Sequence, residues 1–229
     1  MSIKDDNSEI SEDNNDSDIT FKLIIIGDSG VGKSCLALKA IKNIFEDYYS
    51  PTIGFEFLTY STKVEDRNIK LQVWDTCGQE VYRSLITSFY RNSSLAILVY
   101  SIDSEESFRH IETWLNDVKT LSNPNIKMVL IGNKNDLEDQ RKISKEKGEN
   151  FYKDHKLSLF METSAKTGFN SKELFNEVAK ILYEEYKKII VKNGNKPGAL
   201  SNSPVIPVNT DPDLKKDNSD EKRKNGCSC

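Results

Sequence analysis

The sequence predicts an α/β domain whose six-stranded sheet is mostly parallel, includes one antiparallel strand and carries helices on both faces. Short apolar runs alternate with segments of helical periodicity from residue 21 to residue 190, which is typical of a parallel sheet covered by helices. A glycine-rich loop joins the first apolar run directly to the first helical segment. Residues 65–68 have the composition of a turn and separate two later apolar runs, which indicates a hairpin and hence the antiparallel strand.

The individual elements follow from this pattern in chain order. We expect strands at residues 21–26, 55–64, 69–74, 95–100, 127–131 and 158–162. We expect helices at residues 33–45, 80–91, 105–121, 144–155 and 171–190. Ser104 and Ser171 stand at the start of helical runs and are predicted to be N-caps, because a serine hydroxyl can accept a hydrogen bond from a backbone N–H of the first turn.

The two ends of the chain differ in composition from this domain, which is expected to span residues 20–190. Residues 1–19 are rich in Asp, Glu, Asn and Ser, so we expect a disordered acidic extension there. Residues 191–229 are rich in Asn, Pro, Gly and Ser, which indicates a flexible tail.

Composition argues against several classes of protein. The formal net charge of -4 argues against nucleic acid as the main partner. No apolar stretch approaches the roughly 18 residues that a membrane-spanning helix needs, and the N-terminus lacks the pattern of a secretory signal. The four cysteines do not form a disulfide framework, so we expect reduced thiols in the cytosol.

The loop Gly27-Asp28-Ser29-Gly30-Val31-Gly32-Lys33-Ser34 is the clearest functional motif. Its backbone N–H groups and the N-terminus of the following helix can bind phosphates. Lys33 can reach the terminal phosphates, and the hydroxyl of Ser34 can bind Mg²⁺. A chance match in an ordinary loop is the alternative, and the expected strand and helix on either side argue against it. The motif predicts a nucleotide site without distinguishing ATP from GTP.

Polar motifs also follow later strands, and the carboxyl ends of parallel strands meet at one edge of a sheet. Asp75 can hold Mg²⁺ directly or through water, although a role as a helix N-cap alone is the alternative. Gly78 lets the backbone approach a γ-phosphate, and Gln79 can orient an attacking water.

Two further motifs concern the base. The carboxylate of Asp136, in Gly132-Asn133-Lys134-Asn135-Asp136, can accept hydrogen bonds from N1–H and the 2-amino group of guanine. Adenine offers neither group, so the motif discriminates against ATP. The segment Thr163-Ser164-Ala165-Lys166 follows the last strand, and its backbone can contact the guanine O6. Together with the phosphate loop, these motifs predict a guanine nucleotide.

On these motifs, residues 20–190 resemble the P-loop domain of Ras-superfamily small GTPases and, among them, the Rab family. The Rab resemblance depends on Ile53-Gly54-Phe55-Glu56-Phe57, on Lys70-Leu71-Gln72-Val73-Trp74-Asp75-Thr76, on Arg83-Ser84-Leu85, on Phe89-Tyr90-Arg91 and on the terminal Cys227-Ser228-Cys229. It implies a switch that alternates between GDP and GTP, regulates vesicle traffic and hydrolyses GTP to GDP and phosphate with Mg²⁺, slowly without an activating protein. A Rab-like GTP-binding scaffold with weak hydrolysis is the alternative, and a P-loop ATPase or kinase is a second one.

The resemblance implies roles for individual residues. Lys33 and Gln79 would be catalytic, and Ser34, Thr52 and Asp75 would ligate Mg²⁺. The nucleotide would be bound by Asp28, Ser29, Gly30, Val31, Gly32, Lys33, Ser34, Cys35, Phe45, Tyr49, Thr52, Gly78, Asn133, Lys134, Asp136, Ser164, Ala165 and Lys166. Phe57, Trp74 and Phe89 match the aromatic triad that Rabs present to effectors, with ordinary core packing as the alternative.

The resemblance also implies partners and a location. The partners would be effectors, an exchange factor, a GTPase-activating protein, a GDP-dissociation inhibitor and a prenylation escort protein. Geranylgeranyl groups on Cys227 and Cys229 would hold the protein on the cytoplasmic face of an intracellular membrane, with a cytosolic pool; unmodified thiols are the alternative. Three features depart from the family pattern. Cys77 replaces the usual alanine, Ser101 replaces the usual aspartate, and Asn92-Ser93-Ser94 replaces a stretch richer in glycine and alanine.

Overall fold

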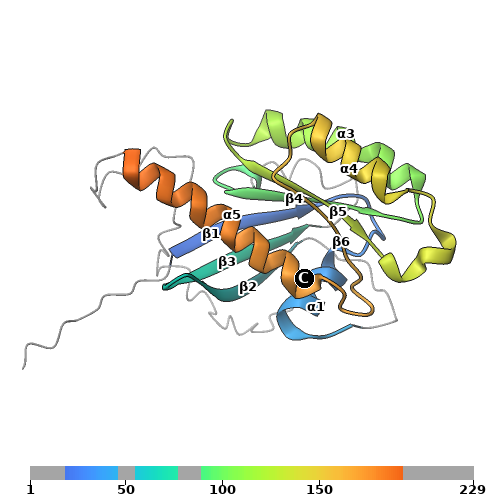
Figure 1. Ribbon diagram of the computed structural model, residues 1–229, viewed down its shortest axis with the longest axis horizontal. Helices are drawn as coiled ribbons and strands as arrows, with labels where there is room; N and C mark the ends of the chain where they lie inside the picture. The colour runs from blue at the N-terminus through green and yellow to red at the C-terminus, as the bar shows by residue number, and fades with distance from the viewer. Residues whose placement is uncertain (1–18, 46–54, 77–88, 193–229) are drawn as a thin grey trace, which may run out of the picture.

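A single six-stranded sheet organises the protein, in the order β2-β3-β1-β4-β5-β6 (Figure 1). The computed structural model describes residues 19–45, 55–76 and 89–192. The strands are β1 (Ile19–Ile26), β2 (Phe55–Val64), β3 (Arg67–Thr76), β4 (Leu95–Ser101), β5 (Lys127–Asn133) and β6 (Leu159–Glu162). β2 runs antiparallel to β3, and all the other pairs are parallel. The predicted α/β architecture is confirmed.

Helices cover both faces of this sheet (Figure 1). The helices are α1 (Lys33–Lys42), α3 (Glu105–Leu121), α4 (Lys145–Asp154) and α5 (Ser171–Lys192). α1 and α5 pack on one face and α3 and α4 on the other, so the buried side chains form two core clusters. The central strand β4 is buried at every position because helices cover it from both sides.

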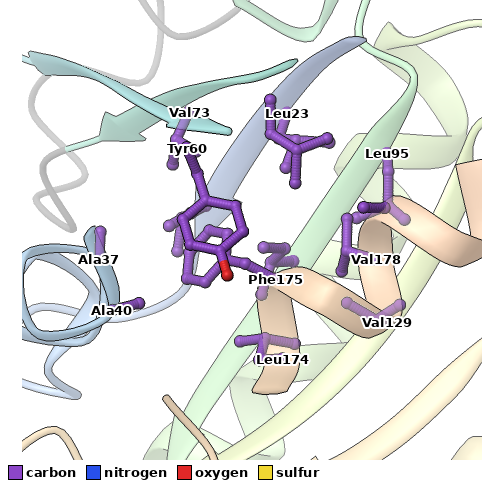
Figure 2. Packing of buried hydrophobic residues seen from close by; sticks show 14 of the residues in the cluster. Leu23, Ala37, Ala40, Tyr60, Val73, Leu95, Val129, Leu174, Phe175 and Val178 are labelled. Carbon is purple, nitrogen blue, oxygen red and sulfur yellow. The ribbon is translucent and has the colours of Figure 1, made fainter. Parts of the chain in front are cut away.

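Side chains of α5 pack against the sheet in the core beneath this helix (Figure 2). Phe175 and Val178 of α5 point toward the sheet, and both are fully buried. The Phe175 ring packs on the ring of Tyr60 from β2, with 5.5 Å between centroids. The Tyr60 hydroxyl in turn donates a hydrogen bond of 2.7 Å to Oδ1 of Asn176. These contacts attach the antiparallel edge of the sheet to the last helix.

The hairpin turn between β2 and β3 is shorter than predicted. Val64 pairs with Arg67, so only Glu65 and Asp66 remain in the turn instead of residues 65–68. Glu65 adopts a φ of 53°, a left-handed conformation that permits a two-residue turn between twisted strands.

Helix ends differ from the predictions where backbone conformation decides them. α1 ends at Lys42 rather than at residue 45, because Asn43 takes a left-handed φ of 55° and its N–H bonds back to Leu38 and Lys39. The predicted N-cap at Ser104 is confirmed, since its hydroxyl accepts a 3.2 Å hydrogen bond from the Ser107 N–H.

The predicted N-cap at Ser171 is wrong. Ser171 is the first residue of α5, and its hydroxyl donates to the Ser164 carbonyl at 3.1 Å instead of capping the helix. The N–H of Leu174 bonds to the carbonyl of Asn170, so Asn170 rather than Ser171 occupies the N-cap position. Asn170 has a φ of 54°.

Two more elements differ from the prediction or lie mostly outside the described residues. A short 3-10 helix, η2 (Asn135–Gln140), follows β5 and was not expected. The predicted helix over residues 80–91 lies largely outside the described residues. Within residues 19–45, 55–76 and 89–192, no helix is both long enough and apolar enough to span a bilayer.

Candidate nucleotide site

The carboxyl ends of β1, β3, β5 and β6 meet at one edge of the sheet, and the predicted site residues gather there. β1 lies between β3 and β4. The chain passes from β1 to β2 and β3 on one side of it, and then crosses to β4 on the other side. Such a switch in strand order opens a crevice outside the strand ends. The phosphate loop connects β1 to α1 across this position.

Two glycines of the phosphate loop are required by geometry. Gly27 has a φ of 144°, and a Cβ there would lie 2.1 Å from the Val99 carbonyl oxygen. Gly32 has a φ of 91°, and a Cβ there would lie 2.5 Å from Nδ2 of Asn133. Any side chain would therefore push the loop away from β4 and from the loop that follows β5.

Lys33 is buried at the start of α1, and its ammonium group binds back to the phosphate loop. The side-chain Nζ donates 2.8 Å and 2.7 Å hydrogen bonds to the carbonyls of Gly27 and Asp28. No side chain caps the N-terminus of α1, so its backbone N–H groups face the loop. A buried positive charge beside a helix N-terminus favours an anion such as a phosphate.

Asp75, near the end of β3, is fully buried, and neither carboxylate oxygen has a hydrogen-bond partner of ordinary geometry in the described part of the chain. Burial raises the pKa of Asp75 to about 6, while the nearby Ser34 hydroxyl and the Lys33 charge act in the opposite direction. A buried carboxylate that lacks ordinary hydrogen bonds within the described residues and lies near a serine hydroxyl fits a hard cation, which supplies positive charge and takes oxygen ligands.

The loops after β5 and β6 are joined by Asn133. Its Nδ2 donates to the Val31 carbonyl of the phosphate loop at 2.9 Å. Its Oδ1 accepts from the Thr163 hydroxyl at 3.0 Å and from the Ala165 N–H at 3.3 Å. One buried amide therefore holds the phosphate loop and both base-binding motifs together, which the sequence did not reveal.

Asp136, the carboxylate of the first base motif, is more exposed than Asn133. Lys134 turns the chain with a φ of 65°, and Asp136 lies on the exposed side of η2. The Ser164 hydroxyl hydrogen-bonds to Oδ1 of Asp136, which links the two base motifs a second time. Asp136 is thus held in an exposed position beside the second predicted base motif.

A buried ion pair supports the base loops from behind, and sequence reasoning missed it. Arg141 donates to both carboxylate oxygens of Glu162, at 2.7 Å and 2.9 Å. Asn135 donates to the same carboxylate at 3.0 Å. Glu162 ends β6 next to the second base motif, so its charge in an otherwise apolar strand was the available signal.

The remaining predicted nucleotide residues are placed around this centre. Ala165 is buried in the core, whereas Lys166 is exposed, as are Ser29 and Gly30 of the phosphate loop. Cys35 is half-buried in α1, and Phe45 follows α1 and packs against the core cluster beneath α5. The side chain of Asp28 turns away from Lys33 toward α3. Tyr49, Thr52, Cys77, Gly78, Gln79, Cys227 and Cys229 lie outside the described residues.

The predicted aromatic triad comes together on the β2–β3 edge of the sheet. The Phe57 and Trp74 rings meet edge to face with 5.3 Å between centroids, and the Trp74 and Phe89 rings lie 5.1 Å apart. Phe57 is 46% exposed, whereas Trp74 and Phe89 are half-buried and pack against the core cluster beneath α3. The aromatic cluster therefore reaches the surface through Phe57.

The profile of the Ras family matches residues 22–184, which is more than half of the 229 residues. The matched span includes the phosphate loop, Asp75 and both base motifs, the same residues that the fold brings to one edge of the sheet. The chain therefore belongs to the Ras family and is a small GTPase that binds guanine nucleotide.

Proposed function

We propose that this GTPase is a Rab-type switch that regulates vesicle traffic from the cytoplasmic face of an intracellular membrane. The observation that carries the proposal is the cluster of Phe57, Trp74 and Phe89, three aromatic rings in contact on the β2–β3 edge of the sheet. A cluster of large, partly exposed aromatics is typical of a surface that binds a partner protein. The terminal Cys227-Ser228-Cys229 supports the same assignment, because it resembles the double-prenylation signal of Rabs.

Hydrolysis in this proposal depends on positioning and charge. Lys33 would stabilise the negative charge that develops on the phosphate oxygens, and Gln79 would orient the attacking water in line with the bond that breaks. Asp75, Ser34 and Thr52 would hold Mg²⁺, which supplies further positive charge to the phosphates when bound. Asp136 would accept the N1–H and 2-amino hydrogen bonds of guanine. Turnover should be slow without an activating protein.

The switch is tested by single-turnover GTP cleavage with and without Rab-type activating proteins. Stimulated cleavage that is lost in Gln79→Leu supports the proposal. Absence of stimulation by any of a panel would instead favour the GTP-binding scaffold. Competition with ATP tests the alternative of a P-loop ATPase or kinase. In a guanine-specific site, ATP should not displace GDP at comparable concentrations, whereas displacement would favour the alternative.

The Rab assignment is tested separately by prenylation. The full chain is incubated with Rab geranylgeranyl transferase, with and without its escort protein, and its mass is measured. Two geranylgeranyl groups, added only with the escort protein, are expected on Cys227 and Cys229. Gly226 stands where a C-a-a-X signal needs cysteine, so modification by a C-a-a-X prenyltransferase would contradict the proposal.

The membrane location is tested by cell fractionation. The variant that lacks residues 227–229 should leave the membrane fraction, because two lipid chains are needed for stable anchoring. Membrane association that persists in this variant would show another anchor. Microscopy of the tagged full chain then identifies the compartment.

A further inference from the structure

The carboxylate of Asp28, in the phosphate loop, is held by two side chains of α3. The indole Nε1 of Trp114 donates to Oδ1 at 2.8 Å, and Nδ1 of His110 lies 2.7 Å from Oδ2. A carboxylate only accepts hydrogen bonds, so Nδ1 of His110 is the donor in this pair. Each oxygen of Asp28 therefore has its own donor, and both donors come from one helix.

α3 presents these two donors from a fixed position. His110 and Trp114 are four residues apart, so they lie one above the other on the same face of the helix. Trp114 is buried, as are its neighbours Ile111 and Leu115, in the core cluster between α3 and the sheet. The Ser104 hydroxyl caps the helix. The helix is thus rigid enough to fix the position of whatever it binds.

The backbone of Asp28 faces the opposite way. Its carbonyl accepts the 2.7 Å hydrogen bond from Nζ of Lys33. Asp28 therefore links α3 to the ammonium of Lys33 through one residue, with its side chain bound on one side and its backbone on the other. Ser29 and Gly30 follow directly and are exposed.

We propose that His110 and Trp114 are positioning residues for phosphate binding. They hold Asp28, and through it the phosphate loop and Lys33, in the shape that receives the nucleotide phosphates. A loop that is already ordered loses less conformational freedom when it binds a ligand, which favours tighter binding. The inference rests on the proposed role of this loop in holding phosphates.

His110 is the better residue for a test because its side chain is 38% exposed. Burial accounts for little of its contribution, so a substitution removes mainly the hydrogen bond to Asp28. Trp114 also fills the core, and its replacement would destabilise the fold as a whole. Arg109 is the matched control, because it is the neighbouring residue on α3 and its side chain, 75% exposed, pairs with Glu106.

The experiment measures dissociation of a fluorescent GDP from the full chain. His110→Ala should accelerate dissociation about three- to tenfold, the loss expected for one partly exposed hydrogen bond to a charged group. His110→Asn keeps a side-chain donor and should restore at least half of the loss on a logarithmic scale. Arg109→Ala should leave the rate unchanged. The unfolding temperature of nucleotide-free His110→Ala should fall by no more than about 4 °C, the loss expected for a single hydrogen bond in a domain of this size.

NMR spectroscopy detects the hydrogen bond between Trp114 and Asp28 directly. The chain has two tryptophans, so its ¹⁵N spectrum should show two indole N–H signals, and Trp114→Phe identifies that of Trp114. Asp28→Ala should move this signal upfield, because the indole loses its carboxylate acceptor. In the Asp28→Ala background, His110→Ala should no longer change the rate of GDP dissociation.

The possible results distinguish a wrong phosphate site from a wrong positioning role for His110. If the wild-type chain does not bind GDP, the proposed phosphate site itself is wrong. If the wild-type chain binds GDP and His110→Ala dissociates at the wild-type rate, the positioning role is wrong. Equal acceleration by His110→Ala and Arg109→Ala, or no rescue by His110→Asn, would also overturn it, since both outcomes indicate general weakening of α3.

Discussion

Replacing Asp75 with asparagine should stabilise the nucleotide-free protein while damaging its function. The carboxyl is fully buried, and burial raises its pKa from 3.8 to about 6. At about 1.4 kcal/mol per pKa unit, holding the ionised form inside the protein at neutral pH costs about 3 kcal/mol. Asparagine has nearly the same shape and no charge, so Asp75→Asn should recover about that amount.

The stability gained by Asp75→Asn should depend on pH. The folded-state pKa is raised, so the stabilising effect of protonation is present in full below the unfolded pKa of 3.8 and disappears as the pH rises through about 6. The advantage of Asp75→Asn should therefore be largest at pH 7.5. It should fall to about half at pH 5 and below about 1 kcal/mol near pH 4.

The assay is thermal unfolding of nucleotide-free protein at pH 5, 6 and 7.5. A gain of about 3 kcal/mol corresponds to a rise in Tm of about 6–12 °C for a domain of this size. Asp139→Asn, at an exposed position of η2, is the control and should change little. With GDP and Mg²⁺ present, Asp75→Asn should lose the stabilisation that Mg²⁺ gives to the wild type. An equal gain at pH 5 and pH 7.5, or no gain at all, would refute the reasoning that a buried charge is the cause.

Three further predictions concern the loops around the site. Gly32→Ala should weaken GDP binding at least about tenfold, because its Cβ would collide with the Asn133 amide; a fluorescent-nucleotide titration measures this, and unchanged affinity would contradict the geometry. Arg141→Met should lower the free energy of unfolding by about 3 kcal/mol in urea, since it leaves the buried Glu162 carboxylate unpaired, whereas the double variant with Glu162→Gln should lose less. Asp136→Asn should weaken GDP binding and improve binding of xanthosine diphosphate, measured by competition; an equal loss for both nucleotides would count against base readout by Asp136.

The order and type of the elements could be predicted because local signals determine them. Apolar runs fully buried between two helical layers, such as β4, are visible in the sequence. Element ends were less predictable, because single residues in left-handed conformations set them. Asn43 ends α1, and Glu65 tightens the hairpin, although neither position holds the glycine that usually marks such a conformation.

The site was predictable as a set of motifs but not as a set of contacts. Glycine spacing and strand-end carboxylates indicate the phosphate loop, Asp75 and Asp136 from the residues alone. The bond from Asn133 to the Val31 carbonyl and the two bonds from α3 to Asp28 join residues more than eighty positions apart. Such contacts depend on the exact approach of loops in the folded chain, which periodicity and propensity do not specify.

The position of the Asn133 amide has a consequence for how the nucleotide is recognised. Because the same side chain anchors the loop for the phosphates and the loop for the base, ordering one half of the pocket also orders the other. The two halves should therefore act as linked fragments: pyrophosphate should increase the affinity for guanosine, and guanosine that for pyrophosphate, by the same factor. Much of the tight hold on the intact nucleotide would then come from this mutual reinforcement rather than from either half alone.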